Sequence, residues 1–239
     1  MFDPMPPGGG ELGGDPTEHV FNQNLDTFVR EVLQNSKDQW LDRADPVHVQ
    51  FDFFELDGEM RDGFLEAMGW TGLKPHLVGT IERGWLSAER IQRELEEIEN
   101  RAQLRILRIS DSNTKGLTGG EWEQKTNFKS LCRDVLTRPE SGEGQGGGAF
   151  GLGKAVLWAY SGVATVIFFS ELSVPETGGS QRLFGRSNLA SHDTGNDRKW
   201  SGQGFFGEEA LPPHSAEPTA VSVWEPPGDV LESLLVPRD

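Results

Sequence analysis

Two hydrophobic periods follow one another near the N-terminus, and this change of period most constrains the fold. After Asn24, apolar side chains recur at helical spacing and form a stripe, made by Leu25, Phe28, Val29, Val32 and Leu33. Residues 47–53 then alternate between apolar and polar side chains, which is typical of a half-buried strand. Asp57-Gly58 predicts the turn that ends this strand. The chain therefore combines amphipathic helices with strands.

The same patterns predict the later elements. Gly72, Pro75 and Gly79 favour loops. Residues 112–148 are polar and rich in glycine, and a segment of this length in a compact domain is usually a lid, a binding loop or disordered. The remaining expectations are helices over 86–102, 128–136 and 152–161, and strands over 104–111, 164–170, 182–186 and 220–224.

Charge and composition exclude several classes of protein. The 239 residues carry a formal net charge of −16, which argues against non-specific binding to nucleic acid by this chain. Cys132 is the only cysteine, so an internal disulfide is impossible. The longest apolar run, residues 163–169, is too short to span a bilayer, and the N-terminus does not read as a signal peptide. We expect a soluble, cytoplasmic protein.

Three oxygen-bearing side chains share one flank of the first helix. At about 100° per residue, Glu31, Asn35 and Asp38 lie within roughly 60° of one another, beside the apolar stripe. A carboxylate and an amide oxygen placed in this way can orient water and hold a hard cation such as Mg²⁺. The alternative is a solvated polar flank.

Asp111 follows an apolar strand and precedes turn residues. An ionised carboxylate only accepts hydrogen bonds, so it suits an exocyclic amine such as that of adenine. The alternative is an ordinary turn at the end of a strand.

The glycine-rich run from Gly144 to Lys154 leads into a predicted helix. Exposed backbone N–H groups, the helix N-terminus and the lysine would together make an anion site. A flexible linker would explain residues 144–148, but not residues 150–154. The run also approximates a dinucleotide fingerprint and a P-loop. No predicted strand precedes it, however, and Ala155 stands where a P-loop has Ser or Thr.

In this order, the three segments resemble the GHKL ATP-binding superfamily of gyrase B subunits, heat-shock chaperone ATPases, histidine kinases, MutL and MORC proteins. Glu31-Val-Leu-Gln-Asn35-Ser-Lys-Asp38 resembles its N-box, and Gly148-Ala-Phe-Gly151-Leu-Gly153-Lys154 resembles the second glycine box of gyrase-type and MORC-like members. Asp111 and Gly116 resemble the first glycine box, with Asn113 in place of a glycine at a turn that needs positive φ. Pro218-Thr219 resembles the late strand that backs the adenine pocket.

The resemblance implies a role for each of these residues. Glu31 would be the general base and Asn35 the Mg²⁺ ligand, with Asp38 as a supporting acid. Asp111 would read adenine, and Thr219 would lie behind it. The remaining positions would complete the nucleotide site: Gly116, Gly148, Gly151, Gly153 and Lys154.

The resemblance also implies an architecture and an activity. The fold would be α+β, a two-layer α/β sandwich of the GHKL (Bergerat) type with a mixed sheet. Residues 1–18 would be a flexible lead-in and 19–226 the ATP-binding domain, with a helical insertion at 59–103, an ATP lid at about 112–148 and a tail at 227–239. The activity would be Mg²⁺-dependent ATP hydrolysis that gates homodimerisation or pairing with a larger partner, in DNA maintenance or anti-phage defence. The alternative is a non-hydrolysing, nucleotide-dependent scaffold or sensor.

Overall fold

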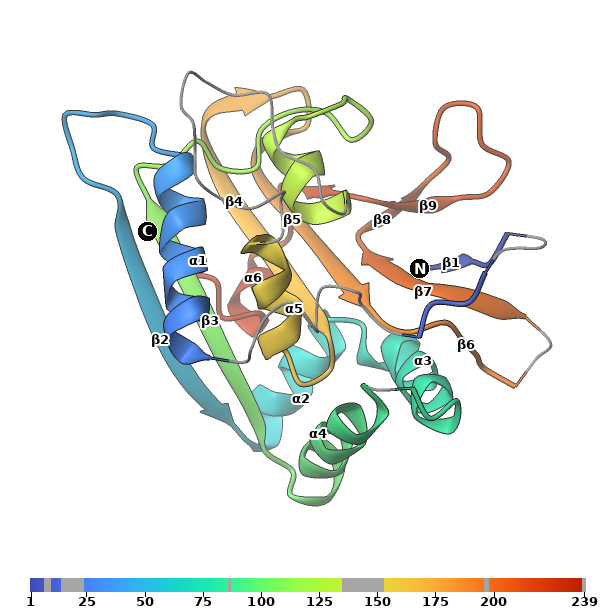
Figure 1. Ribbon diagram of the computed structural model, residues 1–239. Helices are drawn as coiled ribbons and strands as arrows, with labels where there is room; N and C mark the ends of the chain where they lie inside the picture. The colour runs from blue at the N-terminus through green and yellow to red at the C-terminus, as the bar shows by residue number, and fades with distance from the viewer. Residues whose placement is uncertain (7–9, 14–23, 86, 135–152, 196–197, 238–239) are drawn as a thin grey trace.

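The protein has an α+β fold, described by a computed structural model for residues 1–6, 10–13, 24–85, 87–134, 153–195 and 198–237 (Figure 1). The α-helices are α1 (Leu25–Asp38), α2 (Gly58–Ala67), α3 (Trp70–Glu82), α4 (Ala88–Asn100), α5 (Val156–Tyr160) and α6 (Gly228–Ser233). The longer strands are β2 (His48–Leu56), β3 (Leu104–Ser112), β4 (Thr165–Glu176), β5 (Gly179–Asn188) and β7 (Lys199–Phe206). The shorter strands are β1 (Phe2–Pro4), β6 (His192–Asp193), β8 (Glu208–Ala210), β9 (Thr219–Val221) and β10 (Val223–Trp224).

The described strands form three sheets. In the largest sheet β5 pairs with β4, β7 and β10, and β7 also pairs with β1 and β6. The other two sheets are the β2–β3 and β8–β9 pairs. Every pairing in the described part of the chain is antiparallel, so the expected single mixed sheet is not present there. The β2–β3 pair is separate from the largest sheet, because β3 and β4 are not hydrogen-bonded to each other, and residues of both strands line one cavity.

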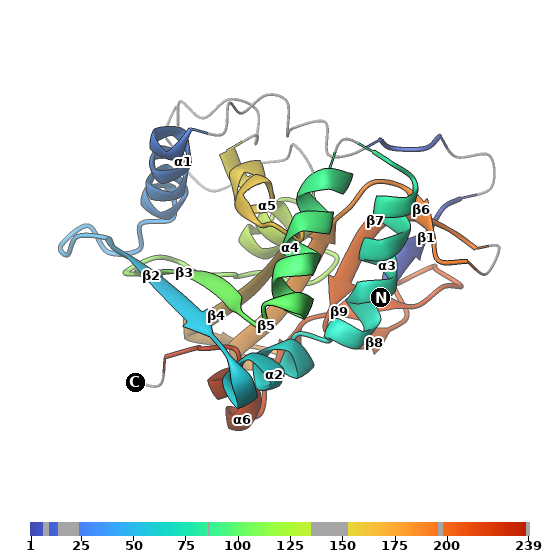
Figure 2. The same ribbon diagram turned by 90° about the horizontal axis from the view of Figure 1, so that it is seen from below.

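Helix α1 forms and packs as its sequence predicts. The side chain of Asn24 caps its N-terminus by accepting a hydrogen bond from the backbone N–H of Asp26 at 2.9 Å. Its buried side chains, Phe28 and Val32, meet Val156 of α5 in one apolar cluster over β2 and β3. As Figures 1 and 2 show, α1 and α5 therefore lie on the same side of these strands.

The segment expected as a helical insertion, residues 59–103, is indeed helical and contains most of α2, α3 and α4. Gly72, Pro75 and Gly79 do not form the predicted loops, because all three lie within α3. Tertiary packing explains this difference at Gly79. A Cβ there would come closer than 3.0 Å to the backbone carbonyl of Asp193, so the helix can approach β6 only with glycine at this position.

Both expected end segments contain structure. In the lead-in, β1 pairs with the edge of β7, and Phe2 is buried against the ring of His76. In the expected tail, α6 buries Leu231 and lies beside α2 (Figure 2). Neither strand nor helix was expected there, because each is stabilised by elements far away in the sequence.

Candidate functional site

A large cavity opens between α1, β3, β4 and the turn before α5. Its volume of about 2190 Å³ exceeds the roughly 300–1,000 Å³ that is typical of small-molecule sites. The cavity is this large because it continues along the space between β3 and β4. Among the residues that line it are most of the described candidates: Glu31, Asn35, Asp38, Asp111, Gly116, Gly153 and Lys154.

Glu31 and Asn35 face the turn that precedes α5. A Cβ added to Gly153 would come closer than 3.0 Å to Oε2 of Glu31 and would lie 3.7 Å from Oδ1 of Asn35. The two oxygens therefore point at the backbone of Gly153, which begins the 3₁₀ turn Gly153–Ala155. This approach leaves no room for a Cβ unless the Glu31 carboxylate moves, and it brings the first and third sequence segments together at one end of the cavity.

Asp111 lies at the other side of the same cavity, near the end of β3. Its side chain is exposed, and its Oδ1 accepts a hydrogen bond from the Thr114 hydroxyl at 2.8 Å. The following turn contains Asn113 at φ 59°, so the asparagine adopts the left-handed conformation that its position was expected to need. The amide of Asn113 donates to the carbonyls of Asp42 and Asp45, at 2.8 and 2.7 Å, and so ties this turn to the segment after α1.

Gly116 also has positive φ, 67°, and lies against β4. A Cβ there would come within 2.5 Å of the hydroxyl oxygen of Ser170. Ser170 is nine-tenths buried and its hydroxyl accepts the backbone N–H of Leu117 at 3.1 Å. Sequence reasoning missed Ser170, although a polar residue directly after an apolar run is a usable signal.

Lys154 is buried, and its ammonium group is engaged within the protein. Its Nζ donates to the carbonyl of Ser130 and, at 2.6 Å, to that of Asp134. Burial and then the neighbouring Arg186 lower the pKa of Lys154 to about 8. The hydroxyl of Ser130 is buried at the cavity wall and has no hydrogen-bond partner among the described residues. This end of the cavity therefore has a buried cation and a free hydroxyl.

Gly148 and Gly151 are outside the described residues, as are residues 135–148 of the expected lid. Thr219 lies on β9, opposite Ala210, and is not among the described residues that line the cavity. Asp38 lines the cavity and is exposed.

The oxygens of Glu31 and Asn35 suit Mg²⁺, which is commonly held by one or two protein side chains together with substrate phosphates. A self-contained metal cage is not present in the described ranges, because no three His, Cys, Asp or Glu side chains there gather as ligands. The donor set thus fits a metal that arrives with a phosphate ligand.

Comparison with protein-family models, with curated proteins and with solved structures yields no match. Within the described residues, no helix has both the length and the apolar character needed to cross a bilayer.

Proposed function

We propose that this chain binds ATP together with Mg²⁺ and hydrolyses it, in the manner of the GHKL ATPases that its motifs resemble. One observation carries the proposal: Glu31 and Asn35 face Gly153 in the same cavity that Asp111 and Gly116 border. Three segments far apart in the sequence, each selected for its chemistry, therefore line one site.

The arrangement suggests a division of the cavity. The carboxylate of Asp111 would accept a hydrogen bond from the exocyclic amine of adenine, beside the Gly116 turn. The phosphates would extend towards Gly153 and Lys154, where backbone N–H groups would donate to them and the Lys154 ammonium, which already donates to two carbonyls, would contribute its positive charge.

Glu31 would act as the general base that takes a proton from the attacking water, and Asn35 would hold Mg²⁺. When bound, Mg²⁺ would neutralise charge on the phosphate oxygens. Family members of this type couple ATP binding to dimerisation, so we propose a switch that pairs two copies or binds a larger partner. A role in DNA maintenance or anti-phage defence is part of the proposal, with contacts to nucleic acid made by another domain or partner because this chain carries a charge of −16.

Titration with Mg·ATP and Mg·ADP, together with measurement of turnover, tests the proposal. Asp111→Asn should weaken binding of both nucleotides by about 10- to 100-fold, because a hydrogen bond to a charged acceptor is lost. Glu31→Ala should keep binding and lower turnover by about 10²- to 10⁴-fold.

Glu66→Ala is the matched control, since it removes an exposed carboxylate of α2 that is not among the described residues lining the cavity. It should change neither quantity. Absence of nucleotide binding by the wild-type protein at millimolar concentration would refute the proposal. Normal hydrolysis by Glu31→Ala would remove the assigned base, whereas binding without turnover in every variant would favour the scaffold or sensor.

A further inference from the structure

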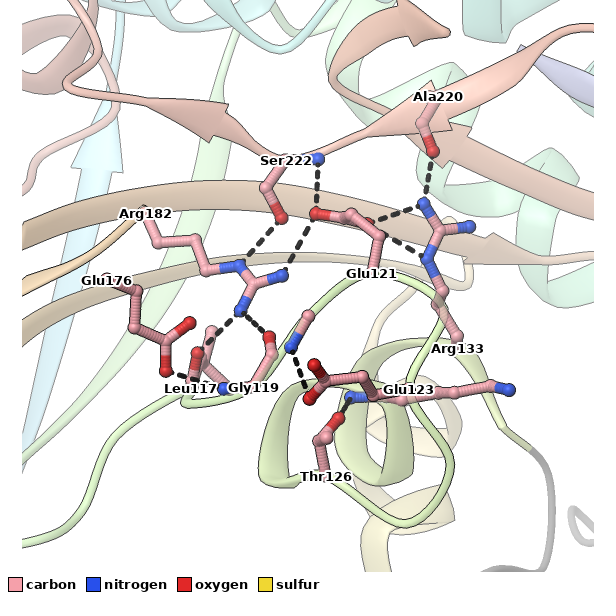
Figure 3. Close-up of polar contacts among 12 residues, drawn as sticks. Leu117, Gly119, Glu121, Glu123, Thr126, Arg133, Glu176, Arg182, Ala220 and Ser222 are labelled. Atoms are coloured by element: carbon pink, nitrogen blue, oxygen red, sulfur yellow. Dashed lines mark hydrogen bonds and ion pairs between the residues drawn. The ribbon is translucent and has the colours of Figure 1, made fainter. Parts of the chain in front are cut away.

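A fully buried arginine on β5, Arg182, donates hydrogen bonds to the backbone immediately after Gly116. The Nη1 of Arg182 donates to the carbonyl of Leu117 at 2.8 Å and to that of Gly119 at 2.7 Å (Figure 3). Its guanidinium also lies 3.4 Å from the ring centroid of Phe128 and 4.7 Å from that of Trp224. Because two aromatic rings contact the guanidinium and its donors are engaged, Arg182 is held in one orientation.

Side chains of two neighbouring strands form hydrogen bonds with the backbone of Leu117. Ser170 of β4 and Arg182 of β5 are directly paired across the sheet. The Ser170 hydroxyl accepts the N–H of Leu117, and the Arg182 guanidinium donates to its carbonyl. Gly119 is fixed in a similar way, because Glu176 accepts its N–H at 2.7 Å while Arg182 binds its carbonyl.

Glu121 links Arg182 to Arg133 and to the backbone of Ser222. Its Oε1 accepts from Arg182 at 2.9 Å and from the backbone N–H of Ser222 at 3.0 Å, and its Oε2 accepts from Arg133 at 3.0 Å (Figure 3). Burial alone would raise the pKa of Glu121, but the hydrogen bonds from Ser222 and the two arginine charges lower it below the ordinary value. Glu121 is therefore ionised at neutral pH and balances the buried guanidinium of Arg182.

We propose that Arg182 is a positioning residue for the part of the nucleotide site that binds adenine. Together with Ser170 and Glu121, it fixes the Gly116–Gly119 turn beside Asp111. This inference rests on the proposed function. It also divides the expected lid, because residues 117–121 are anchored to β4 and β5, and Leu117 lines the cavity. Selectivity for adenine over guanine then depends on the contacts that Arg182, Ser170 and Glu121 make with this turn, which we call the clamp. Asp111 accepts a hydrogen bond from the amine of adenine but repels the carbonyl oxygen that guanine has at the equivalent position.

The test compares ATP and GTP affinities in Arg182→Lys, Ser170→Ala and the wild-type protein. Lysine keeps the charge but cannot span two carbonyls and a carboxylate with one planar group. We expect Arg182→Lys to weaken Mg·ATP binding about tenfold and to narrow the preference for ATP over GTP. At saturating ATP, kcat should stay close to the wild-type value while KM rises, because the substitution affects the part of the site that binds adenine.

Leu77→Ala is the control for a purely structural effect. This substitution creates a cavity under α3, far from the clamp, and should lower thermal stability while leaving the ATP-to-GTP ratio unchanged. If Arg182→Lys does not fold, Ser170→Ala provides the test. This substitution removes only the hydrogen bond between the Leu117 N–H and the Ser170 hydroxyl, and it should also narrow the preference for ATP over GTP.

An unchanged ATP-to-GTP ratio in folded Arg182→Lys, or in Ser170→Ala when that variant decides, overturns the positioning role. Failure of the wild-type protein to bind either nucleotide is a different outcome, because it refutes the proposed function itself.

Discussion

His76 and His192 form a partly buried pair that links α3 to β6. The Nδ1 of His192 lies 2.8 Å from the carbonyl of Ala190, so this nitrogen carries the proton and Nε2 is an acceptor. The Nδ1 of His76, 2.8 Å from that Nε2, must then be the donor. The contact therefore requires a neutral His192, because its Nε2 must keep the lone pair that accepts from His76.

This pair predicts a loss of stability in mild acid. Burial, then His192 and the Met1 ammonium, lower the pKa of His76 from 6.5 to about 3. Between these values the unfolded chain binds more protons than the folded protein, so the free energy of unfolding should fall as pH drops below about 6.5. Urea unfolding at about pH 7.5 and about pH 5 measures this loss, which should be smaller in His76→Gln.

His48→Gln is the matched control, because His48 is exposed. It should retain the wild-type dependence on pH. Equal losses in wild type and His76→Gln would contradict the assignment.

At the scale of elements, α3 provides a matched pair of glycines. Gly72 has open space where a Cβ would be placed, whereas Gly79 is pressed against Asp193. Gly72→Ala should therefore raise the free energy of unfolding by about 0.5–1 kcal/mol, since alanine loses less backbone entropy in a helix. Gly79→Ala should lower it, because α3 must move away from β6. Urea unfolding of the two variants checks the opposite signs, and equal signs would exclude this account of the close approach.

Sequence periodicity was informative for elements that are buried on one face. It located α1, β2, α4 and β3 to within a few residues, because their apolar side chains repeat with the period of the element. It failed for α3, where glycine and proline predicted loops and packing against β6 imposed a helix. Local propensity is a small free-energy term, and tertiary contacts outweighed it there.

At the scale of the whole molecule, the first residues of the chain complete the largest sheet. Phe2 lies 3.7 Å, centroid to centroid, from the ring of His76, and β1 covers the edge of β7. Phe2→Ala should lower the free energy of unfolding by about 3–5 kcal/mol, because it leaves a cavity between α3 and β7.

Phe53→Ala is the comparison variant for this prediction. The Phe53 side chain is 81% exposed, so its removal should change stability by no more than about 0.5 kcal/mol. Thermal or urea unfolding of both variants measures the difference. Similar effects would show that β1 does not contribute to stability.

The sequence by itself determined which residues have the chemistry of a site and which helix or strand carries most of them. Glu31, Asn35 and Asp111 were chosen from spacing and residue type, both of which are local properties. Tertiary structure alone decided that they line one cavity with Gly153, that Thr219 lies away from it, and that Ser170 and Arg182 grip the turn after Gly116. The reason is that a periodic pattern fixes which face of an element is buried, whereas the partner of that face depends on contacts between residues far apart in the chain.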